Sequence, residues 1–216
     1  MSLMDAYLDL KCLLNRGYRK RYALTFVANH YLLTSEERHV LARCVFPASW
    51  IGEVRQKLLA PEDLQGKSLA IDGFNVLITL ESLVEGKATL CEDGLVRDLK
   101  YQGRYKLGEK TRELLKSIGK ALEELEVSGV VFFYGKNTPM SGVVKTLTEE
   151  IMEGYGIPHR VQLVKSPDFE LKRFKTVATA DTGIIAKVPY VFDLARYVGE
   201  MLGRKPLSFD EVLDNM

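Results

Sequence analysis

The sequence predicts an α/β protein with a doubly wound, mostly parallel sheet flanked by helices and preceded by a small all-helical domain. From residue 67 onward, short apolar runs alternate with amphipathic segments of helical period, which is typical of parallel strands joined by helices. Before residue 65, apolar residues recur only at helical spacing. We therefore expect a helical domain over 1–64 and an α/β domain over 65–216.

Helices account for most of the first 60 residues. They are expected over residues 4–14, 18–31, 35–45 and 50–59. Thr34 and Glu37 form a capping-box pattern at the start of the third helix, because each can satisfy a backbone N–H of the other. The segment 60–66 contains Pro61 and Gly66 and is expected to link the two domains.

The α/β part begins with a buried strand and continues in regular alternation. Strands are expected over residues 67–72, 128–134, 160–165, 175–180 and 188–192. Helices are expected over residues 108–126, 140–154, 182–186 and 193–203, and Asp193 is expected to cap the last of them. Residues 86–106 interrupt the alternation and predict a hairpin or ordered loop. The acidic tail from Pro206 is expected to dock loosely or fray.

Composition limits the classes of protein to which the chain can belong. Hydrophobic residues make up 46% of the 216, which is enough for a proper core, and the formal net charge of +1 means that any nucleic-acid footprint must be local. Three widely spaced cysteines suggest reduced thiols rather than a disulfide framework. The sequence has neither a signal-peptide layout nor a run of ~20 apolar residues, so we expect a cytoplasmic protein without a membrane partner.

Two of the predicted strands end in a carboxylate. The strand over 67–72 ends in Asp72 and is followed closely by Asn75, and the strand over 175–180 is followed by Asp181. In open α/β sheets, ligands bind outside the carboxyl ends of the strands. Carboxylates gathered there are suited to a divalent cation, which takes oxygen ligands.

The segments that carry these acids resemble a known family. Residues 71–76, Ile-Asp-Gly-Phe-Asn-Val, resemble the opening signature of PIN-like and NYN-type ribonuclease domains. Residues 164–168, Val-Lys-Ser-Pro-Asp, resemble their mid-domain acid, and residues 178–185 resemble their later Thr/Ser-x-Asp turn. The resemblance covers about residues 67–195. The arrangement also resembles a mainly archaeal family that joins a short helical domain to a PIN-like one, a likeness that carries no function with it.

The resemblance implies a Mg²⁺- or Mn²⁺-dependent ribonuclease that acts on RNA. The residues that match the family's catalytic site are Asp72, Asn75, Asp168 and Asp181. The three aspartates would be metal ligands, and Glu81 or Glu85 after the first strand would complete the set. PIN-like domains often dimerise, so a homodimer is a further expectation.

Each of these residues also has a structural interpretation. An Asp after a strand often caps the next helix, and Asp181 precedes the short helix expected over 182–186. Asn75 could simply complete a turn. The turn at Asp181 also departs from the NYN pattern, which carries two acids as Asp-x-Asp, because Thr182 and Gly183 follow here. The alternative function is therefore a non-catalytic nucleic-acid-binding protein with a degenerate PIN-like site.

Cations and tyrosines are interleaved in the insertion after the first strand. The candidate nucleic-acid-binding residues are Arg97, Lys100, Tyr101, Arg104, Tyr105 and Lys106. Cations follow the backbone of single strands and aromatic faces stack on their bases, although a solvated hairpin would have the same composition. A second basic run, from Lys11 to Arg21, could be a solvated face or a nucleic-acid contact. In a further alternative, the N-terminal helices form a helix-turn-helix-like DNA reader and the α/β part is a partner or sensor domain. A scaffold protein with a vestigial pocket is the remaining alternative.

Overall fold

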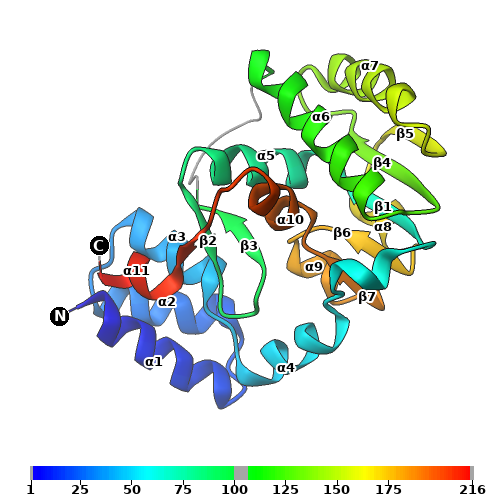
Figure 1. Ribbon diagram of the computed structural model, residues 1–216. Coiled ribbons are helices and arrows are strands. Elements are labelled where there is room, and N and C mark those ends of the chain that lie inside the picture. The colour runs from blue at the N-terminus through cyan, green and yellow to red at the C-terminus, as the bar shows by residue number, and fades with distance from the viewer. Residues whose placement is uncertain (1, 100–106, 215–216) are drawn as a thin grey trace.

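The computed structural model describes residues 2–99 and 107–214 and is built around a five-stranded parallel sheet. The strands are β1 (Ser68–Asp72), β4 (Gly129–Gly135), β5 (His159–Val164), β6 (Thr176–Ala178) and β7 (Tyr190–Phe192). Their order is β5-β4-β1-β6-β7, and each pairs with its neighbours in parallel (Figure 1). The chain starts in the middle at β1, moves out to β5 and returns to the other side through β6. The order of the strands therefore reverses between β1 and β6, which is the usual position of a ligand site in such sheets.

Helices cover both faces of this sheet, as expected. The helices on one face are α5 (Gly73–Val84), α6 (Glu109–Glu124), α7 (Ser141–Met152) and α10 (Leu194–Met201), and those on the other are α4 (Ala48–Lys57), α8 (Pro167–Leu171) and α9 (Thr182–Ile185). Successive side chains of β1 divide between the two faces: Leu69 and Ile71 join the core under α5, and Ala70 joins the core under α9. The continuous apolar run of β1 thus reflects burial on both faces.

The first part of the chain is helical. Its helices before α4 are α1 (Leu3–Asn15), α2 (Lys20–His30) and α3 (Ser35–Cys44). The capping box predicted at Thr34 is confirmed, because the Thr34 side chain accepts from the Glu37 N–H at 3.2 Å and the Glu37 carboxylate accepts from the Thr34 N–H at 2.7 Å. The structure also contains two short 3₁₀ helices, η1 (Pro61–Leu64) and η2 (Glu153–Tyr155).

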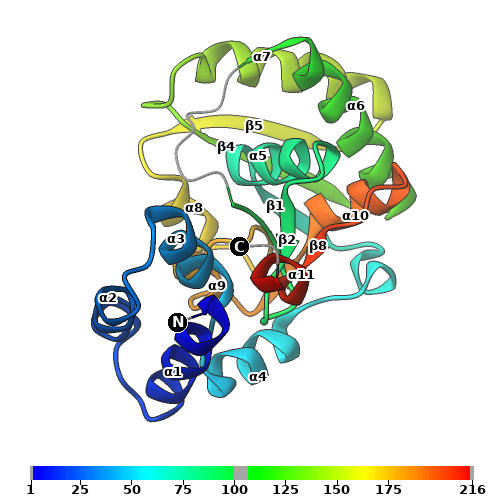
Figure 2. The same cartoon turned by 90° about the vertical axis from the view of Figure 1, so that its left-hand side faces the viewer.

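The insertion and the tail form a second, smaller sheet. Its strands are β2 (Ala88–Leu90), β3 (Val96–Asp98) and β8 (Leu207–Ser208). Strands β2 and β3 pair antiparallel, which confirms the hairpin expected within 86–106. The expectation of a loose tail is wrong. Helix α11 (Phe209–Asp214) packs its apolar side against α1 and β2 (Figure 2), and Phe209, Val212 and Leu213 are all buried in the helical core.

None of the helices in the described ranges has the length and apolar character that a membrane span requires. Cys12, Cys44 and Cys91 are all free thiols, as the sequence predicts.

Candidate functional site

The carboxyl ends of β1 and β6 lie side by side at the point where the strand order reverses. Asp72 is the last residue of β1, and Asp181 follows β6 by three positions. Ile71 and Ala178 are paired in the parallel ladder, so the two acids leave adjacent strands at the same edge of the sheet. The sheet topology therefore brings together two carboxylates that are more than 100 positions apart in the chain.

Short hydrogen bonds connect the two strand ends. The Thr179 hydroxyl donates to Asp72 Oδ2 at 3.0 Å and accepts from the Asp181 N–H at 3.1 Å. The side-chain oxygen of Asn75 accepts from the Ala180 N–H at 2.9 Å. Asn75 thus holds the β6 end in place from the first turn of α5, and its oxygen is occupied in doing so. Thr179 is as important as Asn75 in holding the two strand ends together, but it was not predicted as a site residue from the sequence. Its position in the Thr-x-Asp pattern could have identified it.

Asp72 is held in an environment that opposes its ionisation. The pKa of this carboxyl is raised from 3.8 to about 7, chiefly by burial and in smaller part by the negative charges of Asp181 and Asp168. Hydrogen bonds from Thr179 and from the Asn75 backbone act in the opposite direction. The three aspartates are therefore close enough to interact, and we refer to Asp72, Asp168 and Asp181 as the acid cluster.

The other two members of the acid cluster are more accessible. Asp181 Oδ1 accepts from the Gly183 N–H at 2.8 Å and from the Ile184 N–H at 3.0 Å, so the residue does cap α9. Within the described residues, no bond engages its second oxygen. Asp168 lies in the first turn of α8 and is exposed. No Lys, Arg or His of the described residues forms an ion pair with any of the three.

Glu81 and Glu85 lie away from the acid cluster. Glu81 is two turns along α5, roughly 12 Å from Gly73 at about 1.5 Å per residue, and it lines a separate cavity with Lys110 and Leu202. Glu85 pairs with Lys87 and Lys110. The structure does not place either glutamate with Asp72, because α5 leads away from the strand ends.

The donor set of the acid cluster suits a hard divalent ion with few protein ligands. Within residues 2–99 and 107–214, no group of three or more His, Cys, Asp or Glu side chains lies close enough to hold an ion by itself. Mg²⁺ is usually bound through one or two carboxylates, with waters and substrate phosphates completing its shell. Asp72 and Asp181 fit that pattern, since they provide oxygen donors whose negative charge no neighbouring cation offsets.

The predicted nucleic-acid residues divide into two groups. Lys100, Tyr101, Arg104, Tyr105 and Lys106 lie outside the described residues. Arg97 is described, and it is only 1% exposed. Its guanidinium donates to both Asp93 oxygens at 2.6 and 2.7 Å and to the Ala180 carbonyl at 3.0 Å, so it is a buried structural cation and not part of an open surface.

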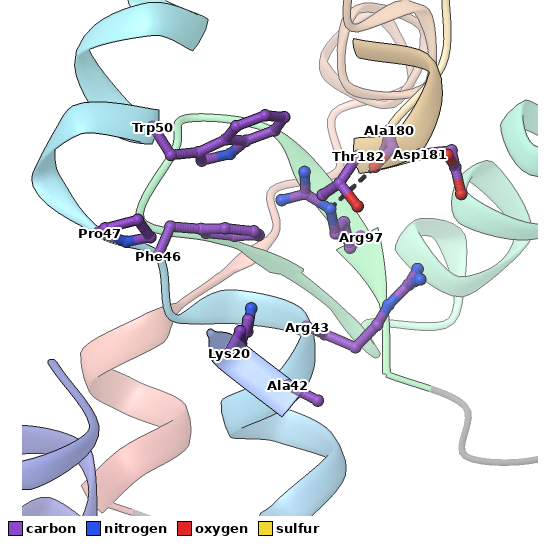
Figure 3. A pocket seen from close by; sticks show the side chains of 10 residues that line it. All are labelled: Lys20, Ala42, Arg43, Phe46, Pro47, Trp50, Arg97, Ala180, Asp181 and Thr182. Atoms are coloured by element: carbon purple, nitrogen blue, oxygen red, sulfur yellow. Dashed lines mark hydrogen bonds between the residues drawn. The ribbon is translucent and has the colours of Figure 1, made fainter. Parts of the chain in front are cut away.

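A cavity of about 370 Å³ lies between the helical region and the acid cluster, and we call it the basic cavity (Figure 3). It is lined by Lys20, Ala42, Arg43, Phe46, Pro47, Trp50, Arg97, Ala180, Asp181 and Thr182. The Phe46 and Trp50 rings are stacked with centroids 6.0 Å apart. The sequence indicates Lys20, Arg97 and Asp181 as candidates for separate reasons, but it could not bring them together, because the cavity walls come from four separate segments.

Two protein-family models match the chain, one over the α/β part and one over the helical part. The family model described as "Domain of unknown function (DUF5616)" matches residues 61–197, which include the acid cluster. The model described as "Protein of unknown function (DUF434)" matches residues 2–57. The chain is 38% identical over 209 residues to "Uncharacterized protein MJ0935" of Methanocaldococcus jannaschii, across 95% of this chain and 100% of that protein. No solved structure matches significantly.

Proposed function

The chain belongs to the family described as DUF5616, and we propose that it is a divalent-metal-dependent ribonuclease whose site is the acid cluster. The observation that carries the proposal is the environment of Asp72. Its carboxyl lies beside two further acids, and no cation among the described residues compensates for their charge. Several carboxylates gathered without a counter-charge raise the free energy of the site, and a bound cation would lower it. A PIN-like fold for the α/β part is a component of the same proposal.

In this proposal Asp72 and Asp181 hold the ion directly, and the exposed Asp168 faces the waters and the substrate side. When bound, a divalent ion lowers the pKa of a coordinated water and offsets charge on the phosphate in the transition state. The protein's own residues orient the acids. Thr179 fixes the Asp72 carboxylate, and Asn75 fixes the backbone that leads into Asp181.

The alternative is a nucleic-acid-binding protein that does not cleave. Two observations favour it: the turn after β6 carries one acid instead of two, and one oxygen of Asp181 is already used to cap α9. Such a protein would bind RNA with a strong dependence on salt concentration and no dependence on a metal ion.

Cleavage of a mixed pool of labelled single-stranded RNAs in Mn²⁺ tests the proposal. Wild type is expected to cleave, and Asp72→Asn is expected to lose on the order of 100-fold or more, because even outer partners of metal ligands are worth 10- to 100-fold. Asp168→Asn should also be slower. Glu170→Gln is the matched control, since Glu170 lies on the same short helix but pairs with Arg173 outside the acid cluster.

The two functions predict different outcomes. Equal cleavage by wild type and Asp72→Asn would contradict the proposed site. If neither protein cleaves and both bind RNA equally in EDTA, the acids are structural and the binding function replaces the ribonuclease. Circular dichroism of each variant establishes that a loss of cleavage is not a loss of fold.

A further inference from the structure

Lys20 is a cation of the basic cavity without a carboxylate partner. Its Nζ lies 4.0 Å from the centre of the Phe46 ring, and within the described residues it forms no ion pair. The guanidinium of Arg97 lies 5.0 Å from the centre of the same ring, so two cations share one aromatic partner. Burial and the Arg97 charge lower the pKa of Lys20 to about 8. Placing an ammonium group here is costly for the protein alone, and an anion in the cavity would offset that cost.

Arg43 supplies a second cation to the lining of the same cavity. Its Nη2 donates to Asp98 at 3.1 Å, whereas its buried Nε donates to no acceptor in the described part of the chain. Arginine presents several N–H donors in a fixed plane, which matches the oxygens of a phosphate. Arg97, in contrast, is fully engaged by Asp93. Of the three cations that line the cavity, Lys20 and Arg43 are therefore the ones that buried carboxylate bonds do not fully engage.

The part of the cavity lining next to Lys20 is flat and aromatic. Phe46 and Trp50 are stacked at an interplanar angle of 26°, and Pro47 continues this wall (Figure 3). The cavity volume of about 370 Å³ falls within the range that small ligands occupy. Cationic side chains beside aromatic faces suit a ligand with an anionic group and a planar ring, which is the chemistry of a nucleotide.

The basic cavity also adjoins the acid cluster, because Asp181 belongs to both. We propose that the basic cavity binds one nucleotide of a single-stranded nucleic acid, with its phosphate on Lys20 and Arg43 and its base against Trp50. This inference rests on the proposed function and extends it. The helical region supplies Lys20 and Arg43, so it forms one wall of the substrate site, and the nucleotide in the cavity lies next to the bond that the acid cluster would cleave.

Trp50 gives a direct measurement, because it is the one tryptophan in the sequence. The full-length protein in EDTA is titrated with AMP, adenosine, inorganic phosphate and a short oligoadenylate, and Trp50 fluorescence is followed at wavelengths where adenine does not absorb. AMP and the oligoadenylate are expected to give saturable changes, and adenosine to bind at least tenfold more weakly. Lys20→Met should weaken AMP about 10- to 100-fold, the usual value of a hydrogen bond to a charged group.

Two further variants make the result specific. Lys20→Arg restores the charge and should recover most of the affinity, whereas Arg21→Met removes a neighbouring exposed cation and should bind as wild type does. Adenosine binding as tightly as AMP, or Lys20→Met binding as tightly as wild type, would overturn the proposal. If AMP binds but the oligoadenylate does not, the ligand is a free nucleotide and not part of a single-stranded nucleic acid, and that part of the proposal is overturned.

The titrations contain EDTA, so their outcome is independent of cleavage. If AMP and the oligoadenylate do not bind but cleavage still depends on Asp72, the nucleotide site in the basic cavity is refuted and the ribonuclease is not. If AMP and the oligoadenylate bind but RNA is not cleaved, the ribonuclease function is refuted and the nucleotide site is not.

Discussion

Asp72 makes folding stability depend on pH in a definite direction. Its pKa is about 7 in the folded protein and near 3.8 in the unfolded chain. Between these values the folded protein holds a proton that the unfolded chain has released, so the contribution of Asp72 to stability falls as pH rises from about 4 to 7. Above pH 7 the carboxylate costs up to roughly 4 kcal/mol. A charge retained at such a cost is suited to a binding role rather than a structural one.

Asp72→Asn is expected to stabilise the protein increasingly as the pH rises. The amide keeps an acceptor for Thr179 and carries no charge, so the variant should gain little at pH 4 and roughly 1 to 4 kcal/mol at pH 8. Urea unfolding in EDTA at several pH values measures the difference. Asp168→Asn, at an exposed position, should show little change across the same range. A constant difference between wild type and Asp72→Asn would contradict this assignment of the pKa.

Arg97 and Asp93 form a buried ion pair, and each charge depends on the other for compensation. Each residue is 1% exposed, and the Trp50 indole also donates to Asp93, at 3.1 Å. Asp93→Asn leaves the guanidinium buried without a counter-charge, so we expect a loss of about 3 to 5 kcal/mol in the free energy of unfolding. Glu150→Gln removes the partner of Arg112 in an exposed pair and should cost less than about 1 kcal/mol. Similar losses from both variants would argue against a buried charge.

Local pattern was sufficient to predict the elements of the main sheet. Short apolar runs bounded by turn residues marked its five strands, and Asp193 was correctly predicted as a cap, since it accepts from the Arg196 N–H at 3.0 Å. The same reasoning could not show that Arg97 is buried, because the Ala180 carbonyl that it binds is 83 positions away. Nor could it show the direction of α5, which decides that Glu81 lies away from Asp72.

The junction between β1 and α5 requires a glycine for steric reasons. A Cβ at Gly73 would lie 2.2 Å from Cε1 of Tyr134. That ring is fully buried, and its hydroxyl is hydrogen-bonded to Thr148 at 2.9 Å, so it has little room to move. The glycine in the motif Asp-Gly-Phe-Asn is thus explained by packing between a helix start and a neighbouring strand.

Gly73→Ala is expected to destabilise the protein by about 1 to 3 kcal/mol, the usual cost of forcing extra volume into a packed site. Gly52→Ala is the matched control, because Gly52 lies within α4 and an added Cβ there meets nothing within 4 Å. The control should be neutral or stabilising by up to about 1 kcal/mol, since alanine is the better helix former. Thermal unfolding compares the two. An unchanged melting temperature for Gly73→Ala would mean that the Tyr134 ring moves freely.

The molecule joins its two ends at the helical region. Helix α11 returns from the end of the chain to pack on α1, where Phe209 meets Tyr7 with ring centroids 5.5 Å apart. The helical core therefore combines residues from both ends of the chain, and the sheet core is built from its middle. The basic cavity and the acid cluster lie where these two cores meet, so the relative position of the helical region controls the shape of the proposed substrate site.

Metal binding should be visible in the stability of the whole protein without any substrate. An ion that binds only the folded state stabilises it by about 2.7 kcal/mol at a concentration 100-fold above its Kd. Protonation of Asp72 competes with the ion, since its pKa of about 7 leaves the carboxyl mostly protonated at pH 5.5 and mostly ionised at pH 8. Mn²⁺ is therefore expected to raise the Tm of wild type more at pH 8 than at pH 5.5. Asp72→Asn should respond weakly at both, and Glu170→Gln should respond as wild type does. If Asp72→Asn gains as much as wild type at pH 8, the ion binds elsewhere on the protein.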